Sequence, residues 1–165
     1  MSQKTISQLH DQHHDDYEVA TRQILEALGD LRELELFGRQ VVVAQYVRPN
    51  VTPKGAFVTV KAQEEDIWQG KIVMIVAAGP EAFLGDEGYV KAMYGEARVP
   101  RAGDWMILKP QDGTLISLRG DGAKKATGKD FRGDDIPVYE WEGWPCKIVT
   151  DEAFIGRVRQ PHVLV

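Results

Sequence analysis

The sequence of 165 residues lacks the features that mark several large functional classes. Its single cysteine, Cys146, excludes an intrachain disulfide and a cysteine-based metal cluster, and it suits a reducing compartment. Lysine and arginine number 20 against 25 acidic residues, so the net charge of −5 gives no support to a nucleic-acid partner. No apolar run is long enough to span a membrane, and we see no secretory signal. We therefore expect a cytoplasmic protein.

Recognisable catalytic patterns are also missing. Cys146 lies in an apolar stretch, where a thiol is normally buried and inert. The carboxylates of 64–66 and 134–135 lack an apolar surrounding that would raise a carboxyl pKa for acid–base catalysis. The lysine-rich segment 122–130 has five residues between its glycines, and it has Asp130 where a phosphate-binding loop needs serine or threonine. We predict a protein that is not an enzyme and has no cofactor.

The polar N-terminal segment contains His10, His13 and His14, whose spacing could place two imidazoles on one helical face. No third ligand is evident, so we predict no metal site. Further along, apolar residues recur at every third or fourth position, which indicates an amphipathic helix. Gly29-Asp30 either ends this helix or interrupts it, with residues 31–36 as a second short helical piece. Its apolar face consists of Tyr17, Ala20, Ile24, Leu28 and Leu31.

This helical face must be buried against something. It could pack on its own domain, which is the default, or on a neighbouring subunit or a host protein. We treat residues 1–35 as an N-terminal tail and helical arm, and the apolar face as a candidate assembly surface.

Residues 36–165 are predicted to form an all-β domain. Short segments rich in β-branched residues alternate with glycine and proline, as in a barrel or sandwich. We expect strands over 39–47, 70–78, 105–109, 114–118, 136–141, 144–149 and 154–158. A hairpin turn is expected over 110–113, and long loops over 48–69, 80–100 and 120–135, with a short strand over 89–94.

The connection over 48–69 is the predicted working part. It contains Pro49, Pro53 and Gly55, followed by a short apolar run from Ala56 to Val60. A connection of this length inside a compact domain is usually functional or disordered.

Several segments, taken in order, resemble the GroES-type co-chaperonin (chaperonin-10) family. Residues 36–43 resemble its first strand, 52–59 its mobile loop, 68–73 the strand that leaves the loop, 99–107 its Val-Gly-Asp strand entry, and 146–158 its closing strand, acidic turn and strand. The resemblance implies a GroES-like partly open β-barrel, here with an added N-terminal amphipathic helix. The arm and the segments 81–98 and 120–142 exceed what the family needs.

The resemblance also implies a function. Barrels of this family form a seven-membered ring that caps a chaperonin, and each mobile loop binds an apolar groove. Carried over to this chain, the partner-binding loop is Gly55, Ala56, Phe57 and Val58. A ring multiplies weak single contacts by avidity. The expected protein is a homo-oligomeric, non-enzymatic co-chaperonin-like lid that assists protein folding, in the host cytoplasm if it is phage-encoded.

An alternative hypothesis is a bacteriophage virion structural protein. Divergent barrels of this type occur in bacteriophage genomes, and a helical arm with long loops suits a barrel fixed in a larger assembly. In this case the chain is a capsid decoration, cement or tail-associated protein, located in the virion and bound to capsid or tail subunits. Neither hypothesis has nucleic acid or a membrane as a partner.

Overall fold

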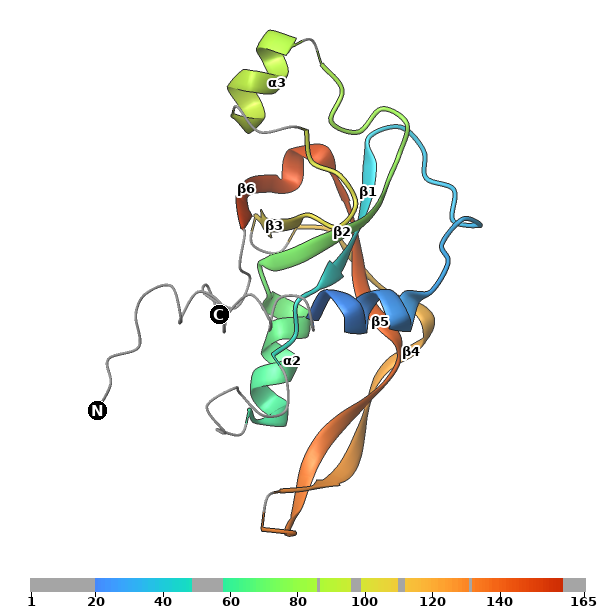
Figure 1. Ribbon diagram of the computed structural model, residues 1–165, viewed down its shortest axis with the longest axis vertical. Coiled ribbons are helices and arrows are strands. Elements are labelled where there is room, and N and C mark those ends of the chain that lie inside the picture. Colours follow the sequence, from blue (N-terminus) through green and yellow to red (C-terminus); the bar gives the residue numbers. More distant parts are fainter. Residues whose placement is uncertain are drawn as a thin grey trace, which may run out of the picture.

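The computed structural model describes residues 20–48, 58–85, 87–95, 99–109, 112–130 and 132–158. A helix over 20–28 is followed by β1 (Gln40–Gln45), α2 (Val60–Gln69), β2 (Ile72–Ala78), α3 (Glu87–Tyr94), β3 (Trp105–Leu108), β4 (Thr114–Lys129), β5 (Asp135–Thr150), the 3-10 turn η1 (Asp151–Ala153) and β6 (Phe154–Val158) (Figure 1). The predicted β-rich fold is confirmed. Of the described helices, none has the length and apolar character needed to cross a membrane.

The strands form one six-stranded sheet in the order β4-β5-β1-β2-β3-β6, and every neighbouring pair is antiparallel. In the described part of the chain β4 and β6 are the two edges, so the sheet is not closed. The predicted hairpin between 105–109 and 114–118 is wrong, because β3 pairs with β2 and β6 while β4 pairs with β5. Directly before β4, Gly113 permits the close approach to β5, because a Cβ atom there would lie 2.5 Å from Val149 Cγ1.

Strand β1 lies near the centre of the sheet because its apolar run can be buried on both faces. Val42 and Ala44 face one core, and Val41 and Val43 face the other. The first core also contains Ile24, Leu28, Tyr46, Val47, Ile72, Met74, Trp105, Trp144 and Cys146. The second contains Val73, Ile75, Phe83, Met106, Leu108, Val149 and Ala153.

The helix over 20–28 covers the first core. Ile24 and Leu28 are each only 1% exposed, and Ala20 and Leu31 pack against the same cluster. Gly29, with φ near +59°, ends the helix, and residues 31–36 form no second helical piece, which decides between the two predicted alternatives. The default packing is therefore the observed one: the helix lies on its own sheet rather than standing apart as an arm.

This packing corrects the candidate assembly surface. Ile24 and Leu28 lie inside the chain's own core, so they are not available to a neighbouring subunit. Tyr17 lies outside the described residues. The helix is also tied to the sheet by polar contacts, because Trp105 Nε1 donates to Thr21 Oγ1 at 3.2 Å and Arg119 Nε donates to the carbonyl oxygen of Leu28 at 3.1 Å.

Two of the predicted loops contain helices. Within 48–69, residues from Val60 onward form α2, whose N-cap Thr59 accepts a hydrogen bond from the Ala62 N–H at 3.1 Å. Within 80–100, the expected strand over 89–94 is instead part of α3. Gly95, with φ near +74°, follows α3 and donates to the Lys91 carbonyl at 2.9 Å, a helix C-cap that the glycine permits.

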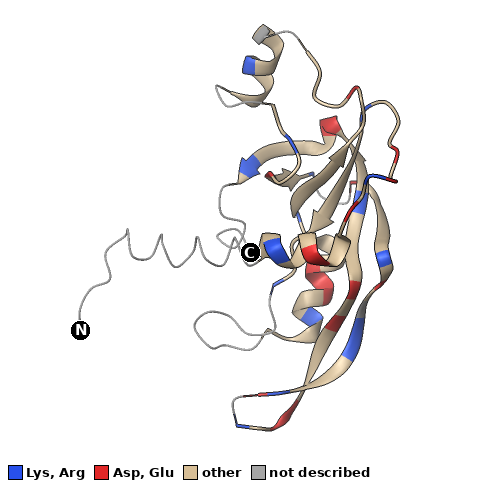
Figure 2. Cartoon of the chain, turned by 45° about the vertical axis from the view of Figure 1, so that its right-hand side comes forward, with Lys and Arg blue, Asp and Glu red and all other residues tan. Residues whose placement is uncertain are grey.

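The predicted loop over 120–135 is also wrong, because β4 and β5 extend through it as a two-stranded ribbon that projects from the body (Figure 1). The segment is polar, yet cross-strand ion pairs favour the paired state. Lys124 and Glu142 lie 2.8 Å apart, and Lys129 pairs with Asp135. Figure 2 shows basic and acidic residues along both strands of this ribbon.

A bulge separates the ribbon from the sheet. The register moves from Leu118↔Trp144 to Gly122↔Glu142, so β4 uses two more residues than β5 over this step. Gly143 permits the close approach, because a Cβ atom there would lie 1.9 Å from the Leu118 carbonyl oxygen.

Candidate protein-interaction sites

The base of segment 49–57 is fixed by an ion pair between Arg48 and Asp66. Arg48 follows β1, and Asp66 lies on α2, at 7% exposure. The Asp66 carboxylate accepts hydrogen bonds from the Arg48 backbone N–H at 2.9 Å and from Arg48 Nε at 2.9 Å. The Asp66 contact raises the pKa of the Arg48 guanidinium above its ordinary value, so Arg48 stays charged.

Two further bonds complete this base. Arg48 Nη2 donates to the Ala62 carbonyl at 3.1 Å, and Gln63 Nε2 donates to the Arg48 carbonyl at 2.8 Å. Gln63 is buried, so this backbone bond is shielded from water. The residues on either side of segment 49–57 are therefore joined to each other through α2.

Helix α2 is also tied to the ribbon. Glu64 accepts a hydrogen bond from the Tyr139 hydroxyl at 2.9 Å and lies 3.1 Å from Lys125 Nζ. The Tyr139 bond, followed by Lys125, lowers the pKa of the Glu64 carboxyl. Burial and the Glu64 bond raise the pKa of Tyr139 to about 12. Glu64 therefore connects α2 to β4 and β5.

The predicted partner-binding residues fall at the edge of the described chain. Gly55, Ala56 and Phe57 lie outside the described residues, and Val58 is half-buried just before the Thr59 N-cap. The contacts that fix the base were not predicted from the sequence. The sequence feature that could have indicated these contacts is the acidic run Glu64-Glu65-Asp66. When this segment is helical, Glu64 and Asp66 lie on different sides of α2.

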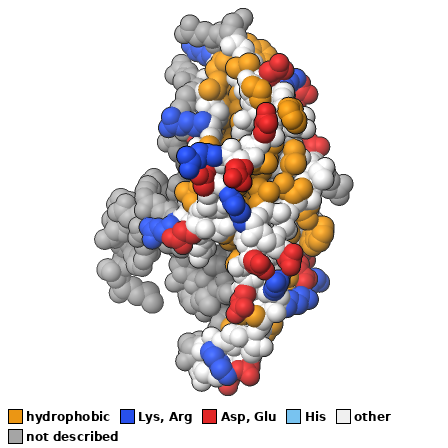
Figure 3. Space-filling model, turned by 90° about the vertical axis from the view of Figure 1, so that its right-hand side faces the viewer, with side chains coloured by type: hydrophobic (Ala, Val, Ile, Leu, Met, Phe, Trp, Pro, Cys, Tyr) orange, Lys and Arg blue, Asp and Glu red, His pale blue; other side chains and the backbone are white. Residues whose placement is uncertain are grey.

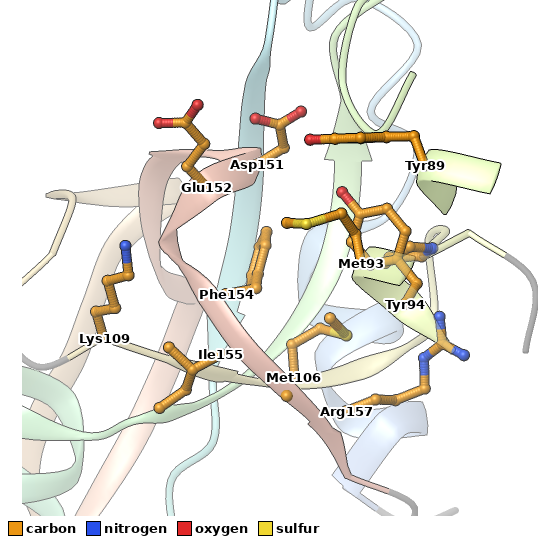
Figure 4. Close-up of a pocket in the computed structure, with 12 residues that line it drawn as sticks. Tyr89, Met93, Tyr94, Met106, Lys109, Asp151, Glu152, Phe154, Ile155 and Arg157 are labelled. Carbon is orange, nitrogen blue, oxygen red and sulfur yellow. The ribbon is translucent and has the colours of Figure 1, made fainter. Parts of the chain in front are cut away.

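A cleft of about 450 Å³ lies between α3 and β6 at the other end of the molecule. Figure 4 shows Tyr89 and Met93 extending from α3 toward Asp151 and Phe154. Tyr94 contacts Phe83 edge-on at 5.9 Å, and this aromatic contact attaches α3 to the second core.

Exposed apolar side chains gather around this cleft. Met93 is 57% and Ile155 61% exposed, and Leu84, Tyr89 and Val99 are exposed nearby in the chain. A different face of the molecule, drawn in Figure 3, has hydrophobic side chains over its upper half and many charged side chains toward its lower end. Because β6 pairs only with β3 among the described strands, its outer edge is open. The cleft also contains the charged residues Lys109, Glu152 and Arg157. Exposed apolar side chains beside an open strand edge are typical of a protein-interaction surface.

Asp151 stabilises one wall of the cleft. It is buried, its Oδ2 accepts a hydrogen bond from the Phe83 backbone N–H at 2.9 Å, and its Oδ1 lies 2.6 Å from Arg39. Phe83 has φ near +57°, an uncommon conformation for a residue other than glycine. Arg39 also pairs with Glu152, and these two carboxylates raise the pKa of its guanidinium. Asp151 thus holds the 79–83 turn against η1.

Two buried titratable groups lie in adjacent positions of β5. Burial raises the pKa of the Cys146 thiol to about 12, which makes it a poor nucleophile at neutral pH. Burial lowers the pKa of the Lys147 ammonium group, with Asp112 acting in the opposite direction. No group of three or more potential ligand side chains is placed to hold a metal ion within the ranges that the structure describes.

No protein-family model matches the chain, and no curated protein matches it.

Proposed function

We propose that the chain is a non-enzymatic, co-chaperonin-like lid that binds a chaperonin through Gly55, Ala56, Phe57 and Val58. The observation that carries this proposal is the fixed base of segment 49–57, in which Arg48 is bonded to Asp66, Ala62 and Gln63. A short apolar segment that leaves a fixed base can engage a groove on another protein while the sheet keeps its structure. Binding of this kind needs neither a catalytic group nor a cofactor.

The sheet supports the resemblance to GroES-type barrels. The resembling segments fall on β1, on the start of β2, on β3 with its preceding turn, and on the end of β5 with η1 and β6. These five strands are consecutive in the order β5-β1-β2-β3-β6. Segments that lie far apart in the sequence thus form one continuous antiparallel unit, as a shared fold requires. We propose that this unit is a divergent, partly open GroES-like barrel.

A ring of identical subunits is the second part of the proposal. The cleft between α3 and β6, with the exposed side chains of Met93 and Ile155, offers an apolar surface for a neighbouring subunit. A ring would present several copies of segment 49–57 at once, so that weak binding by each copy adds up by avidity. We place this assembly in the cytoplasm, which is the host cytoplasm if a bacteriophage encodes it.

The test is capture of the tagged protein by a purified double-ring chaperonin in the presence of ATP or ADP. We expect nucleotide-dependent capture of the wild type and at least a tenfold loss for Phe57→Asp, because a charge replaces the central apolar anchor. Phe37→Asp is the matched control, since Phe37 is 72% exposed in the turn before β1 and lies outside the proposed loop. Capture that is absent for the wild type, or equal for both variants, contradicts the proposal.

A second candidate is a bacteriophage virion structural protein, favoured by the ribbon of β4 and β5. The ribbon extends from the body, and its ion pairs between Lys124 and Glu142 and between Lys129 and Asp135 support the paired strands far from the core. Such an extension can hold a capsid or tail subunit permanently. Mass spectrometry of purified particles tests this hypothesis, which predicts the chain at a fixed copy number per particle.

A further inference from the structure

A second cavity, of about 430 Å³, lies between the helix over 20–28, the end of β1 and the middle of β5. One wall is aromatic: Trp141 and Trp144 stack with their ring centroids 4.5 Å apart and their planes at 23°. Tyr139 lies 5.9 Å from Trp141. Trp144 donates through Nε1 to the Gln45 carbonyl at 2.8 Å, and Tyr139 donates to Glu64, so two of the rings are fixed by hydrogen bonds. Trp141 is half-buried and gives the cavity a rigid aromatic wall.

Apart from Ala27 and Val47, polar residues line the rest of the cavity. Gln23 and Glu26 lie on successive turns of the helix, and both side chains are exposed. Among the described residues neither has a hydrogen-bond or ion-pair partner. Arg48 contributes from the end of β1, and its contacts with Asp66 and Ala62 use Nε and Nη2 but not Nη1. The cavity thus combines an aromatic face with a carboxylate, an amide and part of a guanidinium group.

This combination selects a class of ligand by charge. An anionic ligand is repelled by Glu26, whereas the charge of Arg48 is already balanced by Asp66. A cationic ligand offers no acceptor to Arg48 Nη1 or to the Gln23 amide, so a neutral ligand with both donors and acceptors fits best. The ligand must also donate to the carboxylate and accept from the guanidinium, which hydroxyl groups do at once. A proline ring could pack on an indole but has no donor for Glu26. A pyranose ring has both an apolar C–H face for Trp141 and hydroxyl groups around its edge.

We propose that this cavity binds a neutral saccharide. One sugar ring packs on Trp141, and its hydroxyl groups bond to Glu26, Gln23 and Arg48. The site lies at the junction of the helix with β5, and the residues proposed to bind the sugar differ from those proposed to bind a chaperonin. Saccharide binding is therefore a property separate from chaperonin capture.

The experiment is a titration of the full chain with neutral oligosaccharides, namely maltotriose, cellotriose, N,N′,N″-triacetylchitotriose and mannotriose. Saturation-transfer NMR detects binding, and intrinsic tryptophan fluorescence gives the dissociation constant. We expect saturable binding of at least one of these at millimolar concentration or below. Trp141→Ala should abolish it, Trp141→Phe should weaken it while keeping a ring, and Glu26→Gln should weaken it about tenfold through loss of a charged acceptor.

Trp68→Ala is the matched control, because Trp68 is 65% exposed on α2 and does not line the cavity. The Trp68→Ala variant should bind the saccharide with the same dissociation constant as the wild type. Thermal unfolding shows which variants fold. If Trp141→Ala does not fold, Trp141→Phe is used in its place to test the aromatic wall. The proposal is overturned if no saccharide binds the wild type, if Trp141→Phe and Glu26→Gln bind as well as wild type, or if a proline-rich peptide binds and no saccharide does. Chaperonin capture of Trp141→Phe should be unchanged, which separates failure of this site from failure of the lid.

Discussion

Replacement of Asp66 with asparagine tests the ion pair at the base of segment 49–57. The carboxylate accepts from the Arg48 backbone N–H and from Arg48 Nε, each at 2.9 Å. Asparagine keeps one acceptor oxygen but removes the charge and turns an NH₂ group toward a donor. A hydrogen bond to a charged group contributes about 1.5–3 kcal/mol, and one between neutral groups about 0.5–1.5 kcal/mol.

Two bonds weakened in this way give an expected loss of about 2–3 kcal/mol in the free energy of unfolding. This lies below the roughly 3–5 kcal/mol that follows loss of one partner from a fully buried pair. The difference arises because the Arg48 side chain remains 33% exposed and can rebind water. At about 2–4 °C per kcal/mol for a domain of this size, the melting temperature should fall by roughly 5–10 °C.

Urea unfolding followed by circular dichroism measures this loss. The matched control is Glu65→Gln, which removes the same charge one residue earlier on α2, at an exposed position. We expect Glu65→Gln to change the free energy of unfolding by less than about 0.5 kcal/mol. The reasoning is refuted if Asp66→Asn is as stable as the wild type, or if both variants lose the same amount.

Three further predictions concern buried groups. Asp151→Asn should lower the free energy of unfolding by about 1–3 kcal/mol, because Arg39 loses its buried partner, and a change below about 0.5 kcal/mol in urea unfolding would contradict this role. Cys146 should not react with a disulfide reagent at pH 8 until the protein unfolds. Because burial raises its pKa in the folded protein to about 12, the stability that the protonated thiol contributes is fully present below the ordinary thiol pKa and is lost as the pH rises toward 12. Cys146→Ala should therefore reduce the loss of stability at alkaline pH. Lys147→Met should raise the melting temperature, since it removes a desolvated ammonium group from a largely buried position, and a lower melting temperature would refute this.

The elements predicted correctly from the sequence are those whose structure follows from their local residue pattern. The apolar runs of β1 and β2 can be buried on both faces, and the acidic turn between β5 and β6 follows from Thr150-Asp151-Glu152. The ribbon was missed because it is formed by pairing between residues that lie far apart in the chain, such as Lys124 with Glu140. Its polar composition is otherwise typical of a loop.

The candidate site was predicted only in part for a related reason. The position of the connection over 48–69 followed from its prolines, glycine and apolar run. The contacts that fix its base require α2 to be helical, since only then does Asp66 face Arg48 while Glu64 faces Tyr139. A single sequence shows these carboxylates as one acidic run and does not reveal their separate partners.

Hydrogen exchange of segment 49–58, with and without a chaperonin ring and nucleotide, measures whether this segment is the part of the chain that binds a chaperonin. We expect added protection of residues 55–58 when chaperonin and nucleotide are both present, and no added protection in α2, whose backbone bonds are already formed. Exchange in 55–58 that is unchanged by the chaperonin, while another surface of the chain becomes protected, would contradict it.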